Sequence, residues 1–473
     1  MIEMALRDLA DAGLGEWTGV EARGEFRGVS TDTRTIKPGQ LFVALVGERF
    51  DGHQFLSAAC EAGACAVVVQ RDALCTLPTG VPCLRVLDTG IALGELARLW
   101  RNRLTLTTIA LTGSCGKTTV KEMLGAILRV AFEADQSGAD QRVLLTAGNL
   151  NNQIGLPLTV CRLHAEHTVA VLELGANHEG EIAWTAGICR PDIAVITNVG
   201  QAHLAGFGSV EVVARAKGEI YDALTPQGTA VINLDDAFAP QWLAQNRLAQ
   251  NRGRRCLTFT LYNTKSADVV LEKARYRPGY GSILSIRTPK GVMEVETPLL
   301  GEHNWSNVLA VVSALQPLNV SAEAIRTGLA AVKPVRGRLS PVVAQREGCV
   351  LIDDTYNANP SSVRAAVDVL ATCKGWRVLV LGSMAELGDQ AADLHREVAR
   401  YARDRLIDEL VAIGEFASDM AQGFAGCRVF SSHDEAIAYL QALPHQSSAI
   451  LVKGSRSARM EKVVSALARV EMA

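Results

Sequence analysis

The sequence predicts an α/β protein of three domains: a small α/β N-terminal domain, a central parallel-sheet domain and a C-terminal Rossmann-like domain. Its 473 residues suggest about three domains at roughly 150 residues each. Two blocks contain continuous β-branched runs separated by helical patterns, which is typical of parallel sheets covered on both faces. The block before them mixes short apolar runs with turn residues. We therefore expect domains over residues 1–87, 88–332 and 333–473.

Short apolar segments mark the elements of the N-terminal domain. Residues 41–47 (LFVALVG) and 64–70 (ACAVVVQ) predict strands, and residues 53–63 between them predict a helix. Residues 89–104 carry apolar side chains at helical spacing. We expect this last helix to lead into the central domain.

The central domain is predicted from four apolar runs, each of which ends in polar residues. They lie at residues 107–113, 169–175, 193–200 and 229–236. Ligands of parallel sheets bind at the carboxyl ends of the strands, so the polar residues there are candidates for a site. Residues 255–299 alternate and contain turn dipeptides, which predicts antiparallel strands. Helices near 303–315 and 321–332 should close the domain, and residues 333–337 read as a linker.

The C-terminal block repeats the alternation of strand and helix. Its expected strands lie at residues 349–356, 377–383, 409–415, 427–432 and 449–455. The block contains no G-x-G-x-x-G pattern, so a Rossmann-like fold there does not imply that it binds NAD.

Charge and composition exclude several classes of protein. Lys plus Arg number 47 and Asp plus Glu number 50, so no basic excess would drive binding to nucleic acid. The N-terminus does not resemble a signal peptide, and no apolar run approaches the ~20 residues that span a bilayer. Eleven cysteines without a C-x-x-C pair argue against a disulfide framework or a structural zinc site and fit a reducing cytoplasm.

The strongest local signal is a glycine loop between the strand 107–113 and a helical stretch. Its residues are Thr112, Gly113, Ser114, Cys115, Gly116, Lys117, Thr118 and Thr119. In a P-loop, backbone N–H groups cradle phosphates, the lysine reaches the β/γ-phosphates and the hydroxyl after it can bind Mg²⁺. Leu111 stands where the usual pattern has its first glycine, so the loop is a shortened variant. The alternative is an ordinary glycine turn with a surface lysine.

Three polar residues of the central block extend this signal. Glu173 ends a predicted strand, where a nucleotide-bound Mg²⁺ would lie, although it could also be a carboxylate at a helix entrance. His203 follows another strand and on its own could be an ordinary loop histidine. Lys217 on its own looks like a surface lysine of a helix.

The order of these motifs resembles the Mur ligase family of ATP-dependent amide-bond ligases, which act in peptidoglycan precursor synthesis. The resemblance covers nearly the whole chain and rests on Thr112–Thr119, Glu173, His203, Lys217, Gly301–Asn307 and Asp353-Asp354. Within the family, further stretches resemble the branch that adds D-alanyl-D-alanine to the carboxylate of UDP-N-acetylmuramoyl-tripeptide. These stretches are residues 147–155, 174–182, 202–209, 353–360 and 381–388.

The resemblance implies that ATP phosphorylates the tripeptide carboxylate and that the dipeptide amine then attacks the acyl phosphate. It implies two Mg²⁺ ions, one on Thr118 and Glu173 and one served by His203 and Lys217, with Lys217 carbamylated to give an anionic oxygen ligand. Lys117, His203 and Lys217 are the catalytic candidates.

The resemblance also implies where the nucleotides bind. Asn304 and Asn307, three apart on a helix, would contact adenine, although on their own they could cap the helix. Arg338 would reach an ATP phosphate, and Asp354, or else Asp353, would bind ribose. In the first domain, candidate contacts of the UDP substrate are Ser30, Asp32, Arg34, Arg49, Asp51 and His53, and in the central domain Asn149 and Asn152. Solvated turns with an arginine are the alternative for the loops of the first domain.

Other interpretations remain open at the level of sequence. A sister ligase would add a single amino acid to the same carrier, and a folylpolyglutamate-type ligase would not need the first 87 residues. A P-loop regulatory ATPase would leave His203, Lys217 and the third domain without a role. The segment 453–457 could bind the incoming dipeptide or cap a helix. We expect a cytoplasmic monomer with no membrane span and no nucleic-acid partner.

Overall fold

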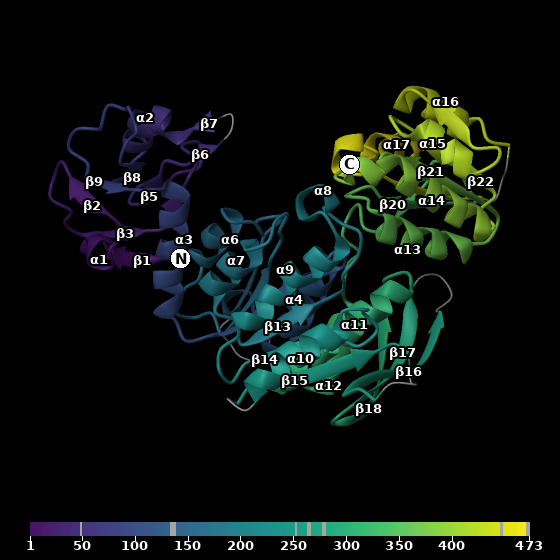
Figure 1. The fold of residues 1–473 in the computed structure, drawn as a ribbon, viewed down its shortest axis with the longest axis horizontal. Coiled ribbons are helices and arrows are strands. Elements are labelled where there is room, and N and C mark those ends of the chain that lie inside the picture. The colour runs from purple at the N-terminus through teal and green to yellow at the C-terminus, as the bar shows by residue number, and fades with distance from the viewer. Residues whose placement is uncertain are drawn as a thin grey trace.

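A computed structural model describes residues 1–47, 50–132, 139–250, 253–262, 266–276, 281–444 and 448–469 of the protein. Figure 1 shows three α/β bodies arranged in an arc, with the N-terminal body at the upper left, the central body below and the C-terminal body at the upper right. The three-domain α/β class predicted from the sequence is confirmed.

The N-terminal body is built on a five-stranded sheet of order β2-β9-β8-β5-β4. Its strands are β2 (Glu16–Thr18), β4 (Val29–Ser30), β5 (Leu41–Val43), β8 (Ala66–Gln70) and β9 (Cys83–Val86). Two small antiparallel pairs accompany it, β1 (Glu3–Ala5) with β3 (Glu25–Arg27) and β6 (Val46–Gly47) with β7 (Phe50–Asp51). The helices are α1 (Arg7–Asp11), the 3₁₀ turn η1 (Gly52–Phe55) and α2 (Leu56–Glu61).

Two expected elements of this body are divided. The strand expected over 41–47 ends at Val43 and resumes as β6, and the helix expected over 53–63 begins as η1. The Asp51 carboxylate accepts the backbone N–H of His53, which starts the tighter turn. Gly52 packs so closely on the backbone of Leu45 that a Cβ would come within 2.8 Å of it. The chain therefore turns sharply here instead of continuing as one long strand and one long helix.

Helix α3 (Thr89–Asn102) connects the N-terminal body to the central one, as the apolar spacing predicts. The Asp88 carboxylate caps it by accepting the N–H of Ile91 at 2.8 Å. The buried side of α3 packs on β8 and on two central helices, α6 (Gly155–Val160) and α7 (Glu181–Cys189).

The central body contains a nine-stranded sheet of order β11-β12-β10-β13-β14-β15-β16-β17-β18. The parallel strands are β10 (Thr107–Thr112), β11 (Val143–Leu145), β12 (Val169–Glu173), β13 (Ile193–Ile196), β14 (Thr229–Asn233), β15 (Arg255–Thr260) and β16 (Val269–Tyr276). The sheet then continues antiparallel through β17 (Ser282–Thr288) and β18 (Gly291–Thr297).

The expectation of antiparallel strands throughout 255–299 is wrong in its first part. β15 pairs parallel with β14 and with β16, so it extends the central sheet. An alternating pattern in the sequence reports how the two faces of a strand are buried and does not report the direction of its neighbours, so it could not distinguish these two arrangements.

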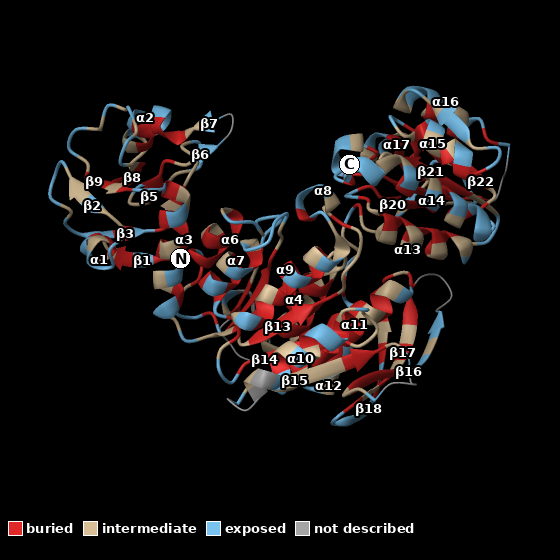
Figure 2. Ribbon diagram, viewed as in Figure 1, coloured by how far each residue is buried: buried red, intermediate tan, exposed pale blue. Residues whose placement is uncertain are grey.

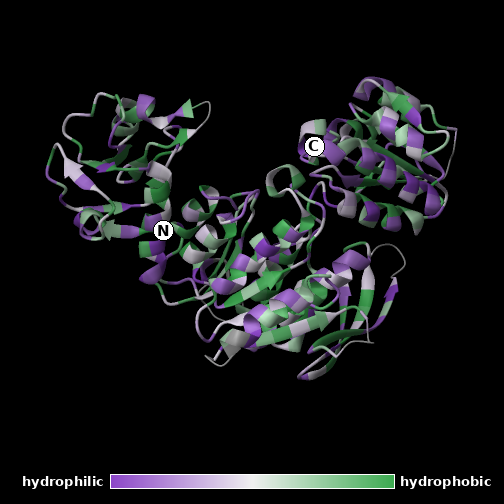
Figure 3. Ribbon diagram, viewed as in Figure 1, coloured by the Kyte–Doolittle hydropathy of each residue, from purple (hydrophilic) through white to green (hydrophobic). Residues whose placement is uncertain are grey.

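Helices cover both faces of the parallel part of this sheet. They are α4 (Lys117–Phe132), α5 (Ala139–Arg142), α6, α7, α8 (Leu204–Phe207), α9 (Val210–Asp222), α10 (Ala239–Gln250), α11 (Glu302–Leu315), η2 (Gln316–Leu318) and α12 (Ala322–Ala330). Alternate residues of β10 point into opposite cores: Ile109 and Leu111 into one, and Ala110 into the other. Figure 2 shows the resulting buried strands in red, and Figure 3 shows their hydrophobic character in green.

The C-terminal body has a six-stranded sheet of order β19-β20-β24-β21-β22-β23, in which only the edge strand β19 is antiparallel among the described pairs. Its strands are β19 (Ser340–Val343), β20 (Cys349–Asp354), β21 (Trp376–Gly382), β22 (Glu409–Ile413), β23 (Arg428–Phe430) and β24 (Ser448–Lys453). Its helices are α13 (Pro360–Ala371), η3 (Gly388–Gln390), α14 (Ala391–Asp404), α15 (Ala417–Gly423), α16 (His433–Gln441), η4 (Arg456–Ala458) and α17 (Glu461–Leu467). The five strands expected there are confirmed, and β19 is an addition.

Within the described residues, no helix combines the length and apolar character that crossing a membrane requires.

Candidate active site between the central and C-terminal domains

The glycine loop leaves β10 and enters α4, as predicted. Gly116 has a φ of +83°, and a Cβ there would lie 2.5 Å from Oδ1 of Asn307. A Cβ on Gly113 would lie 1.9 Å from Oγ1 of Thr197. Both positions therefore require glycine, the first for its conformation as well as its space. The close approach brings the loop against α11 and the end of β13.

Residues after β13 brace the loop in a shape suited to an anion. Asn198 accepts the N–H of Cys115 at 3.0 Å and donates to its carbonyl at 3.1 Å. The N–H of Ser114 donates to the carbonyl of Asn198 at 2.9 Å. These bonds hold the turn before α4 in place, and the helix N-terminus adds its positive end, so the loop forms a phosphate cradle.

Thr118 and Glu173 meet beside the loop. Glu173 lies next to Leu111 in the parallel register of β12 and β10, and its side chain is buried. Its Oε2 accepts the hydroxyl of Thr118 at 3.0 Å, and its Oε1 accepts the amide of Asn151 at 2.8 Å. The interpretation of Glu173 as a helix-entry carboxylate is wrong, since it ends a strand.

This pair of oxygen donors fits Mg²⁺. The ion prefers hard oxygen ligands and is bound in nucleotide sites by one or two protein oxygens, with phosphates and water completing its shell. Among the described residues, no three His, Cys, Asp or Glu side chains cluster as a closed metal site. Thr118 and Glu173 could therefore hold the ion only together with the phosphates of a bound nucleotide.

Two lysines extend this group: Lys117 is half-buried and directly precedes Thr118, and Lys217 is buried and close enough to Lys117 for its pKa to respond to that charge. Lys117 Nζ donates to the carbonyl of Gly113 at 2.6 Å, and burial lowers the pKa of Lys117. Lys217, on α9, is only 2% exposed. Burial and, next, the charge of Lys117 lower the pKa of Lys217 to about 7. Lys217 is thus not a surface lysine, and a large fraction of its amine is neutral near neutral pH.

His203 reaches the same region from the loop before α8. Its Nδ1 pairs with Oε2 of Glu386, which belongs to the C-terminal domain. This hydrogen bond lowers the pKa of Glu386. His203 has a left-handed backbone with a φ of +55°, which is uncommon for a residue other than glycine. The interpretation of His203 as an ordinary loop histidine explains neither its pairing with Glu386 nor its left-handed backbone.

Asn304 and Asn307 are buried side by side on α11, as their spacing predicts. The Asn304 amide donates to the carbonyl of Leu300 at 2.7 Å, and the Asn307 amide donates to Oδ1 of Asn304 at 2.9 Å. Neither side chain caps the helix, whose N-cap residue is Gly301 without a side-chain cap bond. Burial lowers the pKa of the adjacent His303 to about 4, so that imidazole is neutral at physiological pH.

The C-terminal domain contributes a cation and a buried ion pair. The Arg338 guanidinium stacks over the ring of Tyr356, 4.2 Å from its centroid. Lys453 Nζ lies 2.6 Å from Oδ2 of Asp354 and also donates to the carbonyl of Asn357 at 2.9 Å. Burial raises the pKa of Asp354, against the opposing charge of Lys453. Lys453 therefore positions Asp354. Ser455, the N-cap residue of η4, makes no side-chain cap bond, so the alternative that the segment 453–457 caps a helix finds no support there.

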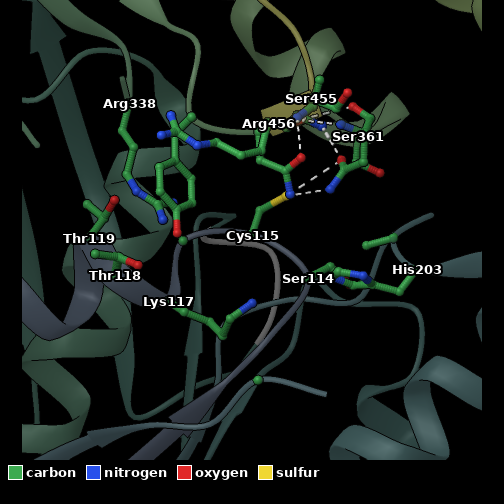
Figure 4. A pocket seen from close by; sticks show the side chains of 18 of the residues that line it. Ser114, Cys115, Lys117, Thr118, Thr119, His203, Arg338, Ser361, Ser455 and Arg456 are labelled. Atoms are coloured by element: carbon green, nitrogen blue, oxygen red, sulfur yellow. Dashed lines mark hydrogen bonds between the residues drawn. The ribbon is translucent and has the colours of Figure 1, made fainter. Parts of the chain in front are cut away.

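These groups surround one cavity of about 800 Å³. Figure 4 shows the loop residues Ser114, Cys115, Lys117, Thr118 and Thr119, together with Arg338, Ser361, Ser455 and Arg456 from the C-terminal domain, around this hollow. The sequence-predicted residues that line it are Ser114, Cys115, Gly116, Lys117, Thr118, Thr119, Asn149, Asn152, Glu173, His203, Asn304, Asn307, Arg338 and Asp354.

Other predicted residues do not line the cavity. Gly113, Lys217 and Asp353 are not among its lining residues, and Oδ1 of Asp353 accepts the N–H and the hydroxyl of Thr355. The N-terminal candidates Ser30, Asp32, Arg34, Asp51 and His53 lie in their own domain. Arg49 lies outside the described residues.

The N-terminal loops have internal partners. Arg34 forms an exposed ion pair with Asp32 at 2.6 Å, which lowers the Asp32 pKa to about 2. His53 is buried: its Nδ1 bonds Asp51 at 2.6 Å and its Nε2 accepts the N–H of Gln70 at 2.9 Å. Both ring nitrogens of His53 therefore have partners within the N-terminal domain.

Sequence reasoning did not assign several lining residues. Asn151 orients Glu173, Glu386 pairs with His203, and Tyr356 stacks on Arg338. All three stand inside stretches that resemble the family, at positions 147–155, 353–360 and 381–388. The family resemblance therefore already marked the stretches that contain these residues. A role could be assigned to each residue only once its partner side chain was known.

The ion pair of Asp354 and Lys453 yields a prediction about stability. Lys453→Met should lower the free energy of unfolding by about 3–5 kcal/mol, because it leaves a buried carboxylate without its partner. Adding Asp354→Leu should recover part of that loss. Urea denaturation without nucleotide measures both effects, with Lys462→Met, an exposed lysine of the same domain, as control. Equal stability of Lys453→Met and Lys462→Met would contradict the prediction.

The fold and the cavity define a class of protein: a P-loop enzyme whose nucleotide site faces a second α/β domain. Comparison with known families narrows the class. The Mur ligase middle domain matches residues 111–315, the glutamate ligase domain of Mur ligases matches 337–456, and the Mur ligase family catalytic domain matches 25–101.

Individual relatives match over nearly the full length. The UDP-N-acetylmuramoyl-tripeptide–D-alanyl-D-alanine ligase of Escherichia coli (strain K12) is 42% identical over 469 residues, 99% of each chain. A crystal structure of MurF from Acinetobacter baumannii, 35% identical, superposes with a TM-score of 0.88 over 98% of both chains. MurF ligase from Thermotoga maritima, in complex with ADP, is 27% identical with a TM-score of 0.79, covering 93% of this chain and 96% of that one.

The chain belongs to the Mur ligase family, and it is an ATP-dependent ligase. Mur ligases use ATP and Mg²⁺, in agreement with the phosphate loop and the Thr118–Glu173 pair. The full-length match includes the first 87 residues, which a folylpolyglutamate-type ligase would not need.

Proposed function

We propose that the protein joins D-alanyl-D-alanine to the free carboxylate of UDP-N-acetylmuramoyl-tripeptide, with cleavage of ATP, in peptidoglycan precursor synthesis. The observation that carries the proposal is the single cavity that brings the phosphate loop and Glu173 together with Arg338 of the C-terminal domain. The 42% identity to the Escherichia coli enzyme of that name, over 99% of both chains, supports the choice of substrates.

The reaction needs activation because a carboxylate is a poor electrophile. A carboxylate oxygen attacks the γ-phosphorus of ATP, the bond to ADP breaks, and an acyl phosphate forms. The dipeptide amine then attacks the acyl carbon, loses a proton, and phosphate leaves. Both steps bring anions together, so the loop N–H groups, Lys117 and Arg338 serve to stabilise the charge that develops on the transferred phosphoryl group.

The ligand sets of the two ions belong to this proposal. Thr118 and Glu173 would hold one Mg²⁺ together with the nucleotide phosphates, and His203 and a carbamylated Lys217 would serve a second. Bound Mg²⁺ neutralises charge on the phosphates. Carbamylation requires a neutral amine, and the pKa of about 7 of Lys217 supplies one near neutral pH. The modification also replaces a buried positive charge beside Lys117 with an anion, which removes the repulsion between them.

The nucleotide contacts follow from the same cavity. Asn304 and Asn307 contact adenine, and Asp354, held by Lys453, binds ribose hydroxyls, since each of its oxygens keeps a free lone pair. Asn149 and Asn152 contact the UDP substrate from the central domain. This arrangement places the adenine-binding residues and the ribose-binding residue on different domains.

The N-terminal domain binds the uridine end of the substrate. The contacts come from Ser30, Asp32, Arg34, Arg49 and Asp51, and Arg34 exchanges its exposed partner Asp32 for the pyrophosphate.

The proposal includes domain limits at 1–87, 88–332 and 333–473, a monomer, and a cytoplasmic location. The eleven free cysteines support a reducing compartment.

Phosphate release should require all three substrates, because the amine resolves the acyl phosphate. The purified protein is assayed with ATP and UDP-N-acetylmuramoyl-tripeptide, with either diaminopimelate or lysine at the third position, with and without D-alanyl-D-alanine. Steady release is expected only in the complete mixture. Rapid ATP hydrolysis without any peptide substrate would contradict the proposal.

A sister ligase that adds one amino acid is distinguished by the amine. The same assay with single L- and D-amino acids in place of the dipeptide should give no steady phosphate release. Faster turnover with a single amino acid than with D-alanyl-D-alanine would show that the substrate has been assigned wrongly.

A further inference from the structure

The segment from Leu381 to Gly388 lines the active-site cavity through Ala385 and Glu386, and the proposed mechanism gives it no role. It is held firmly by its own domain. Met384 and Leu387 are buried in the C-terminal core. The N–H of Met384 donates to Nε2 of His395 at 2.8 Å, and Nδ1 of His395 donates to the carbonyl of Ala391 at 2.6 Å.

This anchoring presents the exposed Ala385 and Glu386 outward between the buried Met384 and Leu387. Glu386 has a φ of +61°, the left-handed region that costs a non-glycine residue free energy. Its partner His203 has a φ of +55° on the other domain. Such conformations persist where the surroundings impose them, and they concentrate at functional sites. Two left-handed residues thus meet side chain to side chain across the domain boundary.

The contact between Glu386 and the central domain is made twice. Its carboxylate pairs with Nδ1 of His203, and its carbonyl accepts the N–H of Ala205 at 3.1 Å. Leu204, between these two residues, packs against the hydrophobic core of the C-terminal domain. The short helix α8 is therefore docked on the C-terminal domain through Glu386.

The geometry has a chemical consequence for the imidazole. A carboxylate that accepts a hydrogen bond from Nδ1–H leaves the lone pair of Nε2 free to accept or to bind a cation. Carboxylates in this position orient ligating histidines in many metal sites and increase their basicity. His203 is one of the residues that line the cavity, so an imidazole oriented in this way is available to the active site.

We propose that Glu386 is a positioning residue that fixes the tautomer and orientation of His203, so that the acceptor side of the active site is complete only while the C-terminal domain is docked on α8. The inference rests on the proposed function, in which His203 serves the second Mg²⁺. It means that docking of the domain and competence for phosphoryl transfer are coupled through one side-chain contact.

The test uses Glu386→Gly in the full-length enzyme, because glycine removes the carboxylate and accepts the left-handed backbone. We expect kcat to fall by about 10–100-fold, the usual effect of losing such a partner, with KM for ATP little changed. The thermal unfolding midpoint should not fall. Leu406→Gly is the matched control: it relieves another positive φ (+56°) on the surface of the same domain and should leave kcat unchanged.

A second readout is independent of turnover. The ¹⁵N resonances of the His203 ring, assigned with His203→Gln, report the tautomer in the absence of substrates. The wild type should show the Nδ1–H form, and Glu386→Gly should show a mixture of tautomers. Unchanged ring resonances, or a kcat equal to that of the wild type, would overturn the inference.

A third variant separates the inference from the proposed function. If His203→Ala loses activity while Glu386→Gly keeps it, His203 retains its role and only the role of Glu386 fails. If His203→Ala is as active as the wild type, the assignment of His203 in the proposed function fails, and the inference fails with it.

Discussion

Replacing Lys117 with alanine is expected to lower the rate of ligation by about 10²–10³-fold, the usual cost of removing one electrostatic stabiliser of a transition state. Lys117 is half-buried, and its ammonium donates a hydrogen bond to the carbonyl of Gly113 at 2.6 Å. Burial lowers the pKa of Lys117, against the opposing charge of Glu173. Because burial destabilises the charged form of Lys117, a ligand of opposite sign should bind favourably beside it, and a nucleotide phosphate has that charge.

The effect on stability should run the other way. Lys117→Met retains the aliphatic stem but removes the buried charge, so its unfolding midpoint without nucleotide should equal or exceed that of the wild type. Lys374→Ala, an exposed lysine of the C-terminal domain, serves as control for activity. Calorimetry should show nearly unchanged affinity for UDP-N-acetylmuramoyl-tripeptide, since we propose that its uridine end binds another domain. Loss of that affinity together with the rate would contradict the domain assignment.

Lys217→Ala should lose most activity, because alanine cannot supply the anionic oxygen that a carbamate provides to Mg²⁺. Lys217→Arg should be equally impaired, since guanidinium keeps the positive charge beside Lys117. Acetate or formate could enter the space vacated in Lys217→Ala and restore part of the activity as its concentration rises. The arginine variant should not respond. Full activity of Lys217→Ala without added acid would refute the carbamate.

The pH dependence of the modification follows from the same lysine. The pKa of Lys217 is lowered to about 7, so the neutral amine that reacts with CO₂ predominates above this pH and becomes scarce below it. Enzyme freed of CO₂ at about pH 6 should regain activity slowly under a fixed partial pressure of CO₂, and faster as the pH is raised through 7, because the dissolved CO₂ is then constant and only the neutral amine increases. Peptide mass spectrometry cannot retain a labile carbamate, so ¹³C NMR of enzyme equilibrated with ¹³C-bicarbonate is the direct measurement. Equal reactivation at pH 6 and pH 8 would contradict the pKa argument.

The sequence by itself determined the features that arise from local patterns. Continuous apolar runs predicted the strands β10, β12, β13 and β14, since a strand buried on both faces needs apolar residues at every position. The glycines and Lys117 predicted the phosphate loop, because few residue types allow a backbone to close around an anion. Family resemblance then supplied the order of Glu173, His203 and Lys217, which no periodicity contains.

Only the tertiary structure decided which of these residues meet. The direction of β15 depended on its neighbours, because alternation reports the burial of each face and is silent about the partner strand. The burial of Lys217, the engagement of both His53 nitrogens and the absence of Asp353 from the cavity lining depend on side chains distant in sequence. The contact of His203 with Glu386 joins residues 183 positions apart on different domains. Hydrogen bonds and pKa shifts act over a few ångströms in space, so they become visible only when the folded chain has brought their partners together.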